Sequence, residues 1–474
     1  MIPINEKYLL ETQGLRNVTA DGKVIGFEVR IRIGYYRGVS LAIVSDLELA
    51  VDGEAFRDGQ LLFGVGGRQY TMSEMAAEES ARWEFDEPAL LTVLKPGGLT
   101  PGAHEITIRQ AILPSYMPGN GFVSVATRTM TLCQDRPTGS AIGLGVSLYS
   151  YQEEYFTGAM SLEDCVAEVA AIGARGVQLL PEQMMPGYPD PPASWVDAWH
   201  ALMERHGTRP TVMDTFVDVS LGGHRVMRRD EAVDHLVIQM KLAKRLGFTM
   251  IRPTTGPVAD AAPELIAASL PFAEELGILV APEIHAPVRL DGPLVTSYLE
   301  LIAASGTKHL GFTLDLGVFC TRMPPAMLGL ARRQGVEPEL VEFVARAFEQ
   351  GQAPEEIAER VQEKGGGEAA RALAMRTAAF GPPSNKPEAL ANVVPHVMNV
   401  HAKFYEVTRE GVEESVPYGP VIDALVAGGY TGSLDSEYEG QRLTQDAFDT
   451  DSCEQVRRHH LLMRDSLRRA VGTP

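Results

Sequence analysis

The chain has 474 residues, of which 45% are apolar and 22% charged, a composition typical of a globular protein with two domains. Its formal net charge of −20 argues against nucleic acid and anionic membranes as partners, because phosphate groups are bound by clustered Lys and Arg. The surplus of carboxylates is compatible with a hard metal cation, whose preferred ligands are oxygens.

Cysteine usage and the start of the chain bear on its compartment. The four cysteines are far apart, which excludes a disulfide framework and a zinc–thiolate site and fits a reducing cytoplasm: Cys133, Cys165, Cys320 and Cys453. The opening MIPINEKYLLETQG lacks a basic segment followed by an apolar one, so we expect no signal peptide. Apolar stretches are interrupted by acids before about 18 residues, so we expect no membrane span.

Residues 1–135 are predicted to form a β-sandwich. GFEVRIRIGYYRG alternates apolar and charged residues with a period of two, which marks a half-buried strand. Asp52-Gly53 predicts a turn between two further strands. ALLTVLKPGGL, HEITIRQAIL and GFVSVATRTMTL continue the pattern, and one short helix is expected near Met72–Arg82. Residues 133–141 carry Pro and Gly and are predicted to be the linker.

Residues 136–474 are predicted to form a (β/α)8 TIM barrel. Continuous apolar runs such as IGLGVS, ILVAPE and GFTLD alternate with amphipathic helices, eight times in all. One unit is oversized, because residues 321–385 form a helical insertion after strand six, which opens at the face where barrel active sites lie. The insertion is expected to act as a lid, as an assembly surface or as a solvated elaboration.

Four strand ends carry candidate metal ligands. Each follows an apolar run, and together they lie on strands five to eight: Glu283, Asp315, His401 and Glu437. Three carboxylates and an imidazole form a mixed O/N set that suits Mn²⁺, with Mg²⁺ as the alternative. Any one of these acids alone would serve equally well as a helix cap or half of an ion pair. Four on consecutive strands favour a metal site.

Side chains two positions apart on a strand share a face, so His285 accompanies Glu283 and Lys403 accompanies His401. His285 is a candidate general base, and the alternatives are a fifth ligand or a hydrogen-bond partner of a ligand. Lys403 is a candidate to neutralise an oxyanion or to donate to a substrate hydroxyl, or else it pairs with a rim carboxylate.

Weaker candidates end two other strands. Tyr149 and Arg252 are predicted to contact substrate. The histidines on outer helices are expected to be solvated or structural: His200, His206, His235, His459 and His460. GxGxxG, GxxxxGK[ST] and GxSxG motifs are missing from the sequence, so neither a nucleotide cofactor nor a serine nucleophile is indicated.

The order of ligands along the last four strands resembles that of the xylose-isomerase-like sugar isomerase/epimerase barrels, across residues 142–474. VHAKF resembles the His-x-Lys strand of that superfamily. Two features depart from its epimerase branch. Val318 stands where those enzymes usually have a histidine, and His285 is added to the pair of glutamates that they use for proton transfer.

The segments EIH and GVSLYSYQ are more similar to the catalytic α subunit of the C-glycoside deglycosidases. Independently, residues 3–132 resemble the small β subunit of the same family, through GFEVRIRIGYYRGVSLAIVSDLELAVDGE, LTVLKPGGLTPGAHEITI and SYMP. The chain therefore resembles a fusion of the two subunits, which in the family are usually separate chains.

The resemblance implies a substrate whose sugar has already been oxidised to a 3-ketone by a separate sugar 3-oxidase. His285 would remove the C2 proton, a divalent cation would hold the neighbouring oxygens, and β-elimination would expel the aglycone and leave a 1,5-anhydro-enulose. We also expect a homo-oligomer and 3-oxo-O-glycosides as further substrates.

Two other functions remain open from the sequence. One is a ketose 3-epimerase or aldose–ketose isomerase, which uses the same deprotonation without elimination; Val318 and His285 argue against it. The other concerns the N-terminal domain, which would be a carbohydrate-binding or assembly module, or an obligate partner that covers a barrel surface.

Overall fold

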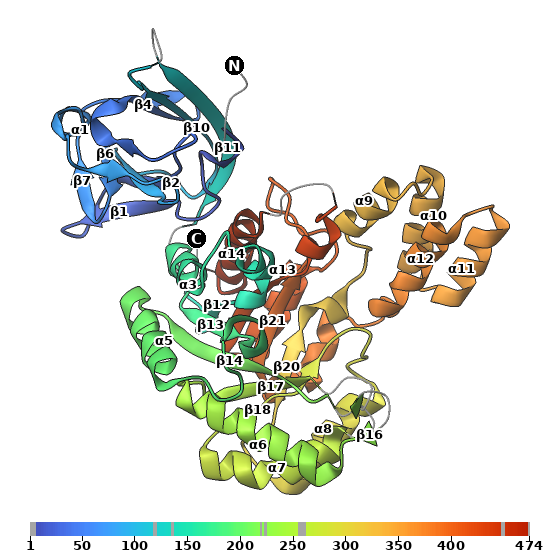
Figure 1. Ribbon diagram of the computed structural model, residues 1–474. Helices are drawn as coiled ribbons and strands as arrows, with labels where there is room; N and C mark the ends of the chain where they lie inside the picture. Colours follow the sequence, from blue (N-terminus) through green and yellow to red (C-terminus); the bar gives the residue numbers. More distant parts are fainter. Residues whose placement is uncertain are drawn as a thin grey trace. The chain divides into compact units, whose positions relative to one another are not determined.

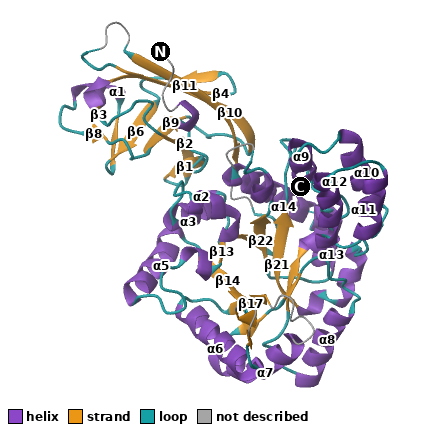
Figure 2. Ribbon diagram, turned by 45° about the vertical axis from the view of Figure 1, so that its right-hand side comes forward, coloured by secondary structure: helices purple, strands orange, loops and turns teal. Residues whose placement is uncertain are grey.

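The computed structural model describes residues 6–116, 121–133, 137–218, 220–221, 225–254, 262–446 and 451–472. Contacts divide the chain into two compact units: Met1–Arg136 with Ala171–Gly173, and Pro137–Ala170 with Ala174–Pro474. Figures 1 and 2 show a unit built of strands and a unit in which strands are surrounded by helices. The predicted fold class, a β-sandwich followed by a TIM barrel, is confirmed for the described residues.

Two larger antiparallel sheets make up most of the first unit, besides a two-stranded sheet of β3 (Val39–Ser40) and β8 (Arg82–Trp83). One has the order β1-β2-β9-β6-β7 and the other β11-β10-β4-β5. Their strands are β1 (Arg16–Ala20), β2 (Lys23–Ile31), β4 (Val44–Val51), β5 (Glu54–Phe56), β6 (Leu61–Val65), β7 (Arg68–Tyr70), β9 (Ala89–Leu94), β10 (Gly102–Ile112) and β11 (Phe122–Leu132). Both sheets contribute to one apolar core, with Phe27 of β2 and Ile108 of β10 fully buried. The predicted alternation in β2 therefore faces that core.

Turn and helix ends in this unit follow from local chemistry. Asp52 and Gly53 both have positive φ, +50° and +85°, as a two-residue hairpin turn between β4 and β5 requires. The helix expected near Met72–Arg82 is shorter and runs Met72–Ala77 (α1). It ends there because the Glu78 carboxylate accepts from the backbone N–H groups of the next turn, which pulls the chain out of helical geometry.

Eight parallel strand positions make up the barrel of the second unit. They are β12 (Gly143–Ser147), β13 (Gly176–Leu179), β14 (Arg209–Phe216), β17 (Met250–Thr254), the pair β18 (Leu279–Val280) and β19 (Glu283–Ile284), β20 (Phe312–Asp315), β21 (Val397–Phe404) and β22 (Ser433–Tyr438). β18 pairs with β17 and β19 with β20, while β12 pairs with both β13 and β22, so the ring closes. Pro282 separates the two short pieces, because its missing N–H breaks the ladder.

Helices cover the outside of the ring (Figure 2). They are α3 (Leu162–Ala171), α5 (Ala193–His206), α6 (Arg229–Arg245), α7 (Ala262–Leu276), α8 (Pro293–Ser305), α13 (Tyr418–Ala427) and α14 (Ser452–Ala470). Between β20 and β21 four more helices pack on one another around their own apolar core (Figure 1): α9 (Pro325–Arg333), α10 (Pro338–Glu349), α11 (Pro354–Glu363) and α12 (Glu368–Arg376). They fall within the predicted insertion 321–385.

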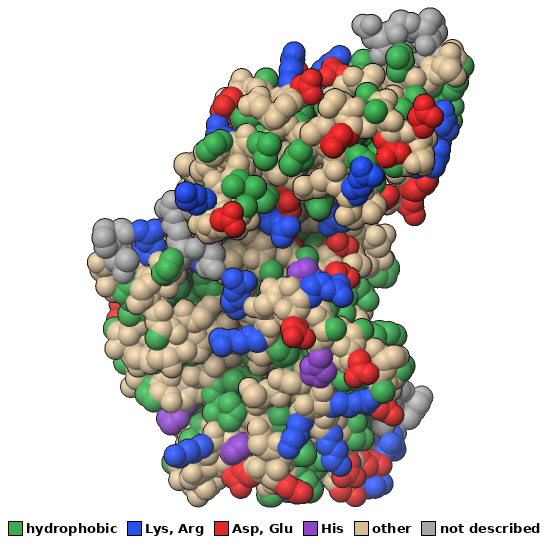
Figure 3. Space-filling view, turned by 90° about the vertical axis from the view of Figure 1, so that its left-hand side faces the viewer, with side chains coloured by type: hydrophobic (Ala, Val, Ile, Leu, Met, Phe, Trp, Pro, Cys, Tyr) green, Lys and Arg blue, Asp and Glu red, His purple; other side chains and the backbone are tan. Residues whose placement is uncertain are grey.

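The surface and the cysteines agree with a well-packed globular chain. On the face drawn in Figure 3, acidic and basic side chains are interspersed, so the net negative charge does not gather there in one acidic patch. All four cysteines are buried, and within the described residues none forms a disulfide. Among the described helices, none combines the length and the apolar character that a membrane crossing requires.

The C-terminal helix α14 is anchored to the barrel by buried polar groups. Arg457 donates to both carboxylate oxygens of Glu168, at 2.6 and 2.9 Å. His459 is fully buried, stacks on Phe404 with ring centroids 4.0 Å apart and bonds the Ser436 hydroxyl at 2.7 Å. Of the two roles expected for the helix histidines, His459 has the structural one.

Glu154 ties the start of α14 to the short helix α2 (Gln152–Phe156). Its Oε1 accepts from the Ser452 N–H at 2.9 Å, while its buried Oε2 has no hydrogen-bond partner among the described residues. Burial raises the pKa of Glu154 to about 7. Below about pH 7 the neutral carboxyl is therefore the predominant form in the folded protein.

We expect Glu154→Gln to change how stability depends on pH. Because the folded pKa lies above the unfolded one, the stabilisation from the Glu154 proton is present below the unfolded pKa and is lost as pH rises through about 7. A permanently neutral Gln avoids that loss. The free energy of unfolding of the variant, relative to that of the wild type, should therefore rise between pH 5 and 8, by up to about 3 kcal/mol. Urea unfolding across this range measures it. The exposed Glu275→Gln serves as control, and equal pH slopes in wild type and Glu154→Gln would contradict the prediction.

Candidate active site

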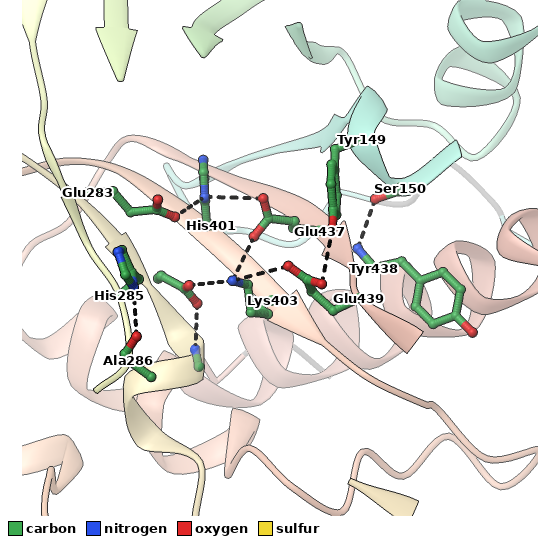
Figure 4. A network of polar contacts seen from close by, with 12 residues as sticks. Tyr149, Ser150, Glu283, His285, Ala286, His401, Lys403, Glu437, Tyr438 and Glu439 are labelled. Atoms are coloured by element: carbon green, nitrogen blue, oxygen red, sulfur yellow. Dashed lines mark hydrogen bonds and ion pairs between the residues drawn. The ribbon is translucent and has the colours of Figure 1, made fainter. Parts of the chain in front are cut away.

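Strands β19, β21 and β22 bring three predicted ligands together. The ligand atoms of Glu283, His401 and Glu437 all lie within 4.8 Å of one another. His401 Nδ1 is 2.8 Å from Glu283 Oε1 and 3.4 Å from Glu437 Oε1, and its side chain is fully buried (Figure 4). The register places His401 beside Asp435 and Lys403 beside Glu437, so alternate residues of β21 and β22 project inward.

Charge balance holds this cluster together. Burial alone would raise the pKa of Glu283, but Arg252, His401 and Lys403 hold it well below its usual value. Burial likewise opposes ionisation of Glu437, yet His401 and Lys403 lower its pKa to about 2. Burial disfavours the imidazolium of His401, but Glu437 and Glu283 raise the His401 pKa well above normal. Two ionised carboxylates therefore converge on a point where positive charge is required.

This donor set fits a divalent cation. Two carboxylates and an imidazole supply hard and borderline ligands. Glu437 Oε2 is a buried oxygen without a hydrogen-bond partner among the described residues, so it has acceptor capacity to spare. In the structure a proton on His401 Nδ1 is stabilised by the same two carboxylates that would hold the cation. Metal binding would replace that proton.

Asp315, the fourth predicted ligand, is not a member of the cluster. Its Oδ2 lies 2.7 Å from Lys403 Nζ, and its Oδ1 accepts from the Gly317 N–H at 2.7 Å. Burial raises the pKa of Asp315, with Lys403 acting against that shift. Lys403 also lies 3.5 Å from both Glu437 and Glu439, so it makes the rim ion pairs that were the alternative to a role in chemistry.

His285 lies on the side of the site next to Glu283 (Figure 4). Its Nδ1 is 2.6 Å from the backbone carbonyl oxygen of Ala286. A carbonyl only accepts, so Nδ1 carries a hydrogen and the neutral ring keeps its lone pair on Nε2. The ring is half-buried and is outside the three-residue cluster. This tautomer is the one that a base acting through Nε2 needs.

The two predicted substrate contacts both touch the charged network. The Arg252 guanidinium is buried and lies 2.9 Å from Asp214 and 3.1 Å from Glu283, so it orients a predicted ligand. The Tyr149 hydroxyl donates to Glu439 at 3.1 Å. Burial raises the pKa of Tyr149, with Glu439 adding to it, so the phenol stays protonated. Figure 4 shows the resulting chain of contacts from Glu283 through His401, Glu437, Lys403 and Glu439 to Tyr149.

Sequence reasoning missed three residues of this network. Gln178 on β13 lies 2.6 Å from His401 Nε2 and 2.7 Å from Asp214. Asp214 lies near the end of β14, as the predicted ligands lie near the ends of apolar runs, and Glu439 is two residues beyond Glu437. Strand ends and alternation were therefore sufficient signals for Asp214 and Glu439. Gln178 carried no such signal, because a neutral amide in an apolar strand is indistinguishable from a structural residue.

Comparisons with known proteins place both units in known families. Residues 166–459 match the family model of the xylose isomerase-like TIM barrel, and residues 5–116 match that of the C-glycoside deglycosidase beta subunit. The C-glycoside deglycosidase alpha subunit of Arthrobacter globiformis is 31% identical over 343 residues, which are 70% of this chain and 94% of the relative. The 3'-dehydrocarminate deglycosidase alpha subunit of a Microbacterium species is 30% identical over 68% of this chain and 94% of the relative.

The N-terminal unit has relatives of its own. The C-glycoside deglycosidase beta subunit of Eubacterium cellulosolvens is 34% identical over 114 residues, which are 24% of this chain and 78% of the relative. The fold and the site thus define an enzyme of the xylose isomerase-like barrel class. The chain belongs to the C-glycoside deglycosidase family, and it carries the α-subunit-like and β-subunit-like parts in one polypeptide.

We expect Mn²⁺ to raise the melting temperature of the wild-type protein and to have little effect on Glu437→Gln. A cation at 100 times its Kd stabilises a folded protein by about 2.7 kcal/mol, and loss of one of two carboxylates should remove most of that. Glu439→Gln, on the same strand end but outside the cluster, is the control and should keep the shift. Thermal unfolding of EDTA-stripped protein with and without Mn²⁺ measures it; equal shifts in Glu437→Gln and wild type would show that the cluster holds no cation.

Proposed function

We propose that this protein is a metal-dependent lyase that cleaves the glycosidic C–C bond of 3-oxo-C-glycosides. The observation that carries the proposal is the position of His285, with its Nε2 lone pair available, beside a buried cluster of two ionised carboxylates and an imidazole. Family membership supports the same reaction class, because two relatives are named as deglycosidases of C-linked or dehydrogenated glycosides.

The 3-ketone makes the C2 proton of the sugar acidic. His285 Nε2 accepts that proton, and the Ala286 carbonyl stabilises the imidazolium through Nδ1. The electron pair of the C2–H bond moves into the ring to form the C1=C2 bond, and the bond from C1 to the aglycone breaks. The aglycone carbon takes a proton, so the products are the free aglycone and a 1,5-anhydro-enulose, with no net redox change.

A divalent cation held by Glu283, His401 and Glu437 would supply Lewis-acid stabilisation of the charge that develops on the sugar oxygens; Mn²⁺ is our candidate, with Mg²⁺ the alternative. Asp315 would be a fourth ligand if its carboxylate turned away from Lys403. Lys403, whose pKa is raised well above normal by Asp315 and Glu437 despite its burial, stays cationic and faces the developing negative charge. Arg252 holds Glu283 in place.

The proposal also covers how the two parts of the protein are assembled and where its substrate comes from. The β-subunit-like unit takes the place of a separate partner chain, and a separate sugar 3-oxidase supplies the 3-ketone, because the proposed elimination starts from a sugar that is already oxidised. We propose 3-oxo-O-glycosides as further substrates, because C2 deprotonation is common to both.

Incubation of the protein with Mn²⁺ and a 3-oxo-C-glucoside of a phenolic ring should release the free aglycone. Chromatography of the reaction mixture measures that release. Omission of the metal or addition of EDTA should stop the release. Conversion of free ketoses into their epimers, without release from any C- or O-linked 3-oxo-glycoside, would replace the proposal with the epimerase alternative.

His285→Asn should lower kcat by roughly 10²- to 10⁴-fold, the range that general-base help contributes, while Mn²⁺ still raises the melting temperature as in the wild type. His200→Asn, on the exposed face of α5, is the matched control and should keep full activity. If His285→Asn loses the Mn²⁺ shift together with activity, His285 is a ligand and its role as base is wrong.

A further inference from the structure

The loop between β19 and α8, residues 285–292, is held from outside by one side chain. We refer to it as the His285 loop. Asn385 Nδ2 donates to the Val288 carbonyl oxygen at 3.0 Å, and Asn385 Oδ1 accepts from the Leu290 N–H at 3.0 Å. Among the described residues, no other hydrogen bond joins residues 286–290 to a partner outside the loop. The position of the loop therefore depends on Asn385.

Asn385 also joins the His285 loop to the end of the next strand. Its Nδ2 donates to the Val318 carbonyl oxygen at 3.0 Å, in the short helix η5 (Leu316–Phe319) that directly follows β20. A side-chain amide has two N–H donors and one acceptor oxygen, and these three bonds use all three groups. One planar side chain thus sets the spacing between the segments that follow β19 and β20.

The helical insertion supplies this side chain, because Asn385 is the last residue of the segment 321–385. Phe380 is buried and belongs to the apolar core of the insertion, where it lies edge-on to Phe348 of α10 with ring centroids 5.9 Å apart. The folded insertion therefore holds the start of the segment that ends at Asn385.

The same segment makes a second contact with the His285 loop. Gly381 has a φ of +65°, and a β-carbon added to it would come within 2.8 Å of Pro287 Cβ. Only glycine allows this approach without displacement of Pro287. The end of the insertion thus meets the loop through a close backbone contact at Gly381 and through hydrogen bonds at Asn385.

The supports of His285 and of the metal cluster are separate. The His285 ring bonds only the Ala286 carbonyl of its own loop, among the described residues, so the ring moves with the loop. Glu283 is instead held by the pairing of β19 with β20, where it lies opposite Thr313, and by Arg252. A displacement of about 1 Å at a reacting group can lower a rate about 10²-fold. Support of the loop is therefore support of the base.

We propose that Asn385 is a positioning residue that fixes His285 relative to the barrel, and that the folded insertion holds Asn385 in place. The proposal rests on the proposed function for the role of His285, whereas the clamp on the loop does not. Loss of the Asn385 amide should loosen the His285 loop and leave the cluster of Glu283, His401 and Glu437 intact.

Hydrogen exchange of the full-length protein, without metal or substrate, tests the clamp independently of turnover. In Asn385→Ala the Leu290 N–H loses its acceptor, so the peptide with residues 286–292 should exchange about tenfold faster or more. The Thr313 N–H, which donates to the Pro282 carbonyl, is the internal reference and should exchange as in the wild type, which also shows that the variant is folded.

Asn392→Ala, which removes an exposed asparagine shortly after the insertion, is the matched control and should leave both exchange rates unchanged. Equal exchange of residues 286–292 in wild type and Asn385→Ala would overturn the proposal.

Turnover of a 3-oxo-C-glucoside distinguishes positioning from a general loss of structure. Asn385→Ala should lower kcat about 10- to 100-fold, keep KM within about threefold and keep the Mn²⁺ shift in melting temperature. Asn385→Asp retains the acceptor but turns an oxygen toward two carbonyl groups, so it should be no more active than Asn385→Ala.

A double variant shows whether Asn385 acts through His285. In the His285→Asn background, Asn385→Ala should lower kcat by less than about twofold further, because the base that it positions is already missing. A further loss as large as in the single variant would overturn the proposal.

The clamp and the proposed function fail in different experiments. If residues 286–292 exchange faster in Asn385→Ala but the wild type cleaves no 3-oxo-glycoside, the clamp stands and the proposed function falls. If the wild type cleaves the substrate and Asn385→Ala keeps its kcat, the proposed function stands and the positioning role of Asn385 is wrong.

Discussion

Charge balance at the C-terminal end of the barrel is the constraint on which the rest of the site depends. Glu283 and Glu437 are ionised although both are buried, and burying unpaired carboxylates would cost several kcal/mol each. His401 offsets that cost from between them, and Arg252 and Lys403 do so from either side. These five groups come from β17, β19, β21 and β22, and the strand register fixes their positions. The site therefore forms only when the ring is closed.

The same balance explains why the site is poised for a cation. A proton on His401 is the smallest positive charge that satisfies both glutamates, and it occupies the nitrogen that a metal would use. Gln178 contacts the other ring nitrogen, so the imidazole is held on both edges. Lys403 also pairs with Asp315 and Glu439, and the Glu439 carboxylate accepts from the Tyr149 hydroxyl. One set of contacts thus runs from Glu283 to Tyr149.

Much of this could be predicted from sequence because strand alternation has a period of two. Once the apolar runs were assigned to parallel strands, Glu283, His401 and Glu437 had to meet at one end of the ring. Asp315 was assigned by the same rule to the same metal, but in the structure it pairs with Lys403 at 2.7 Å. Alternation places both side chains on one face and is silent on which of several acids a flexible lysine contacts. The helix near Met72 was predicted to be longer than it is for a related reason. A hydrophobic pattern does not show the hydrogen bonds that the Glu78 side chain accepts from backbone N–H groups.

The sequence by itself determined the order of strands, the face on which each polar residue lies and the family of the chain, because these depend on local periodicity and on residue identity. Only the tertiary structure decided which side chains contact each other: Arg252 with Asp214 and Glu283, Gln178 with His401, and Lys403 with Asp315. It also decided the tautomer of His285, through one bond to the Ala286 carbonyl. The physical reason is that these contacts join residues from different strands and loops, and the distances between them exist only once the ring has closed.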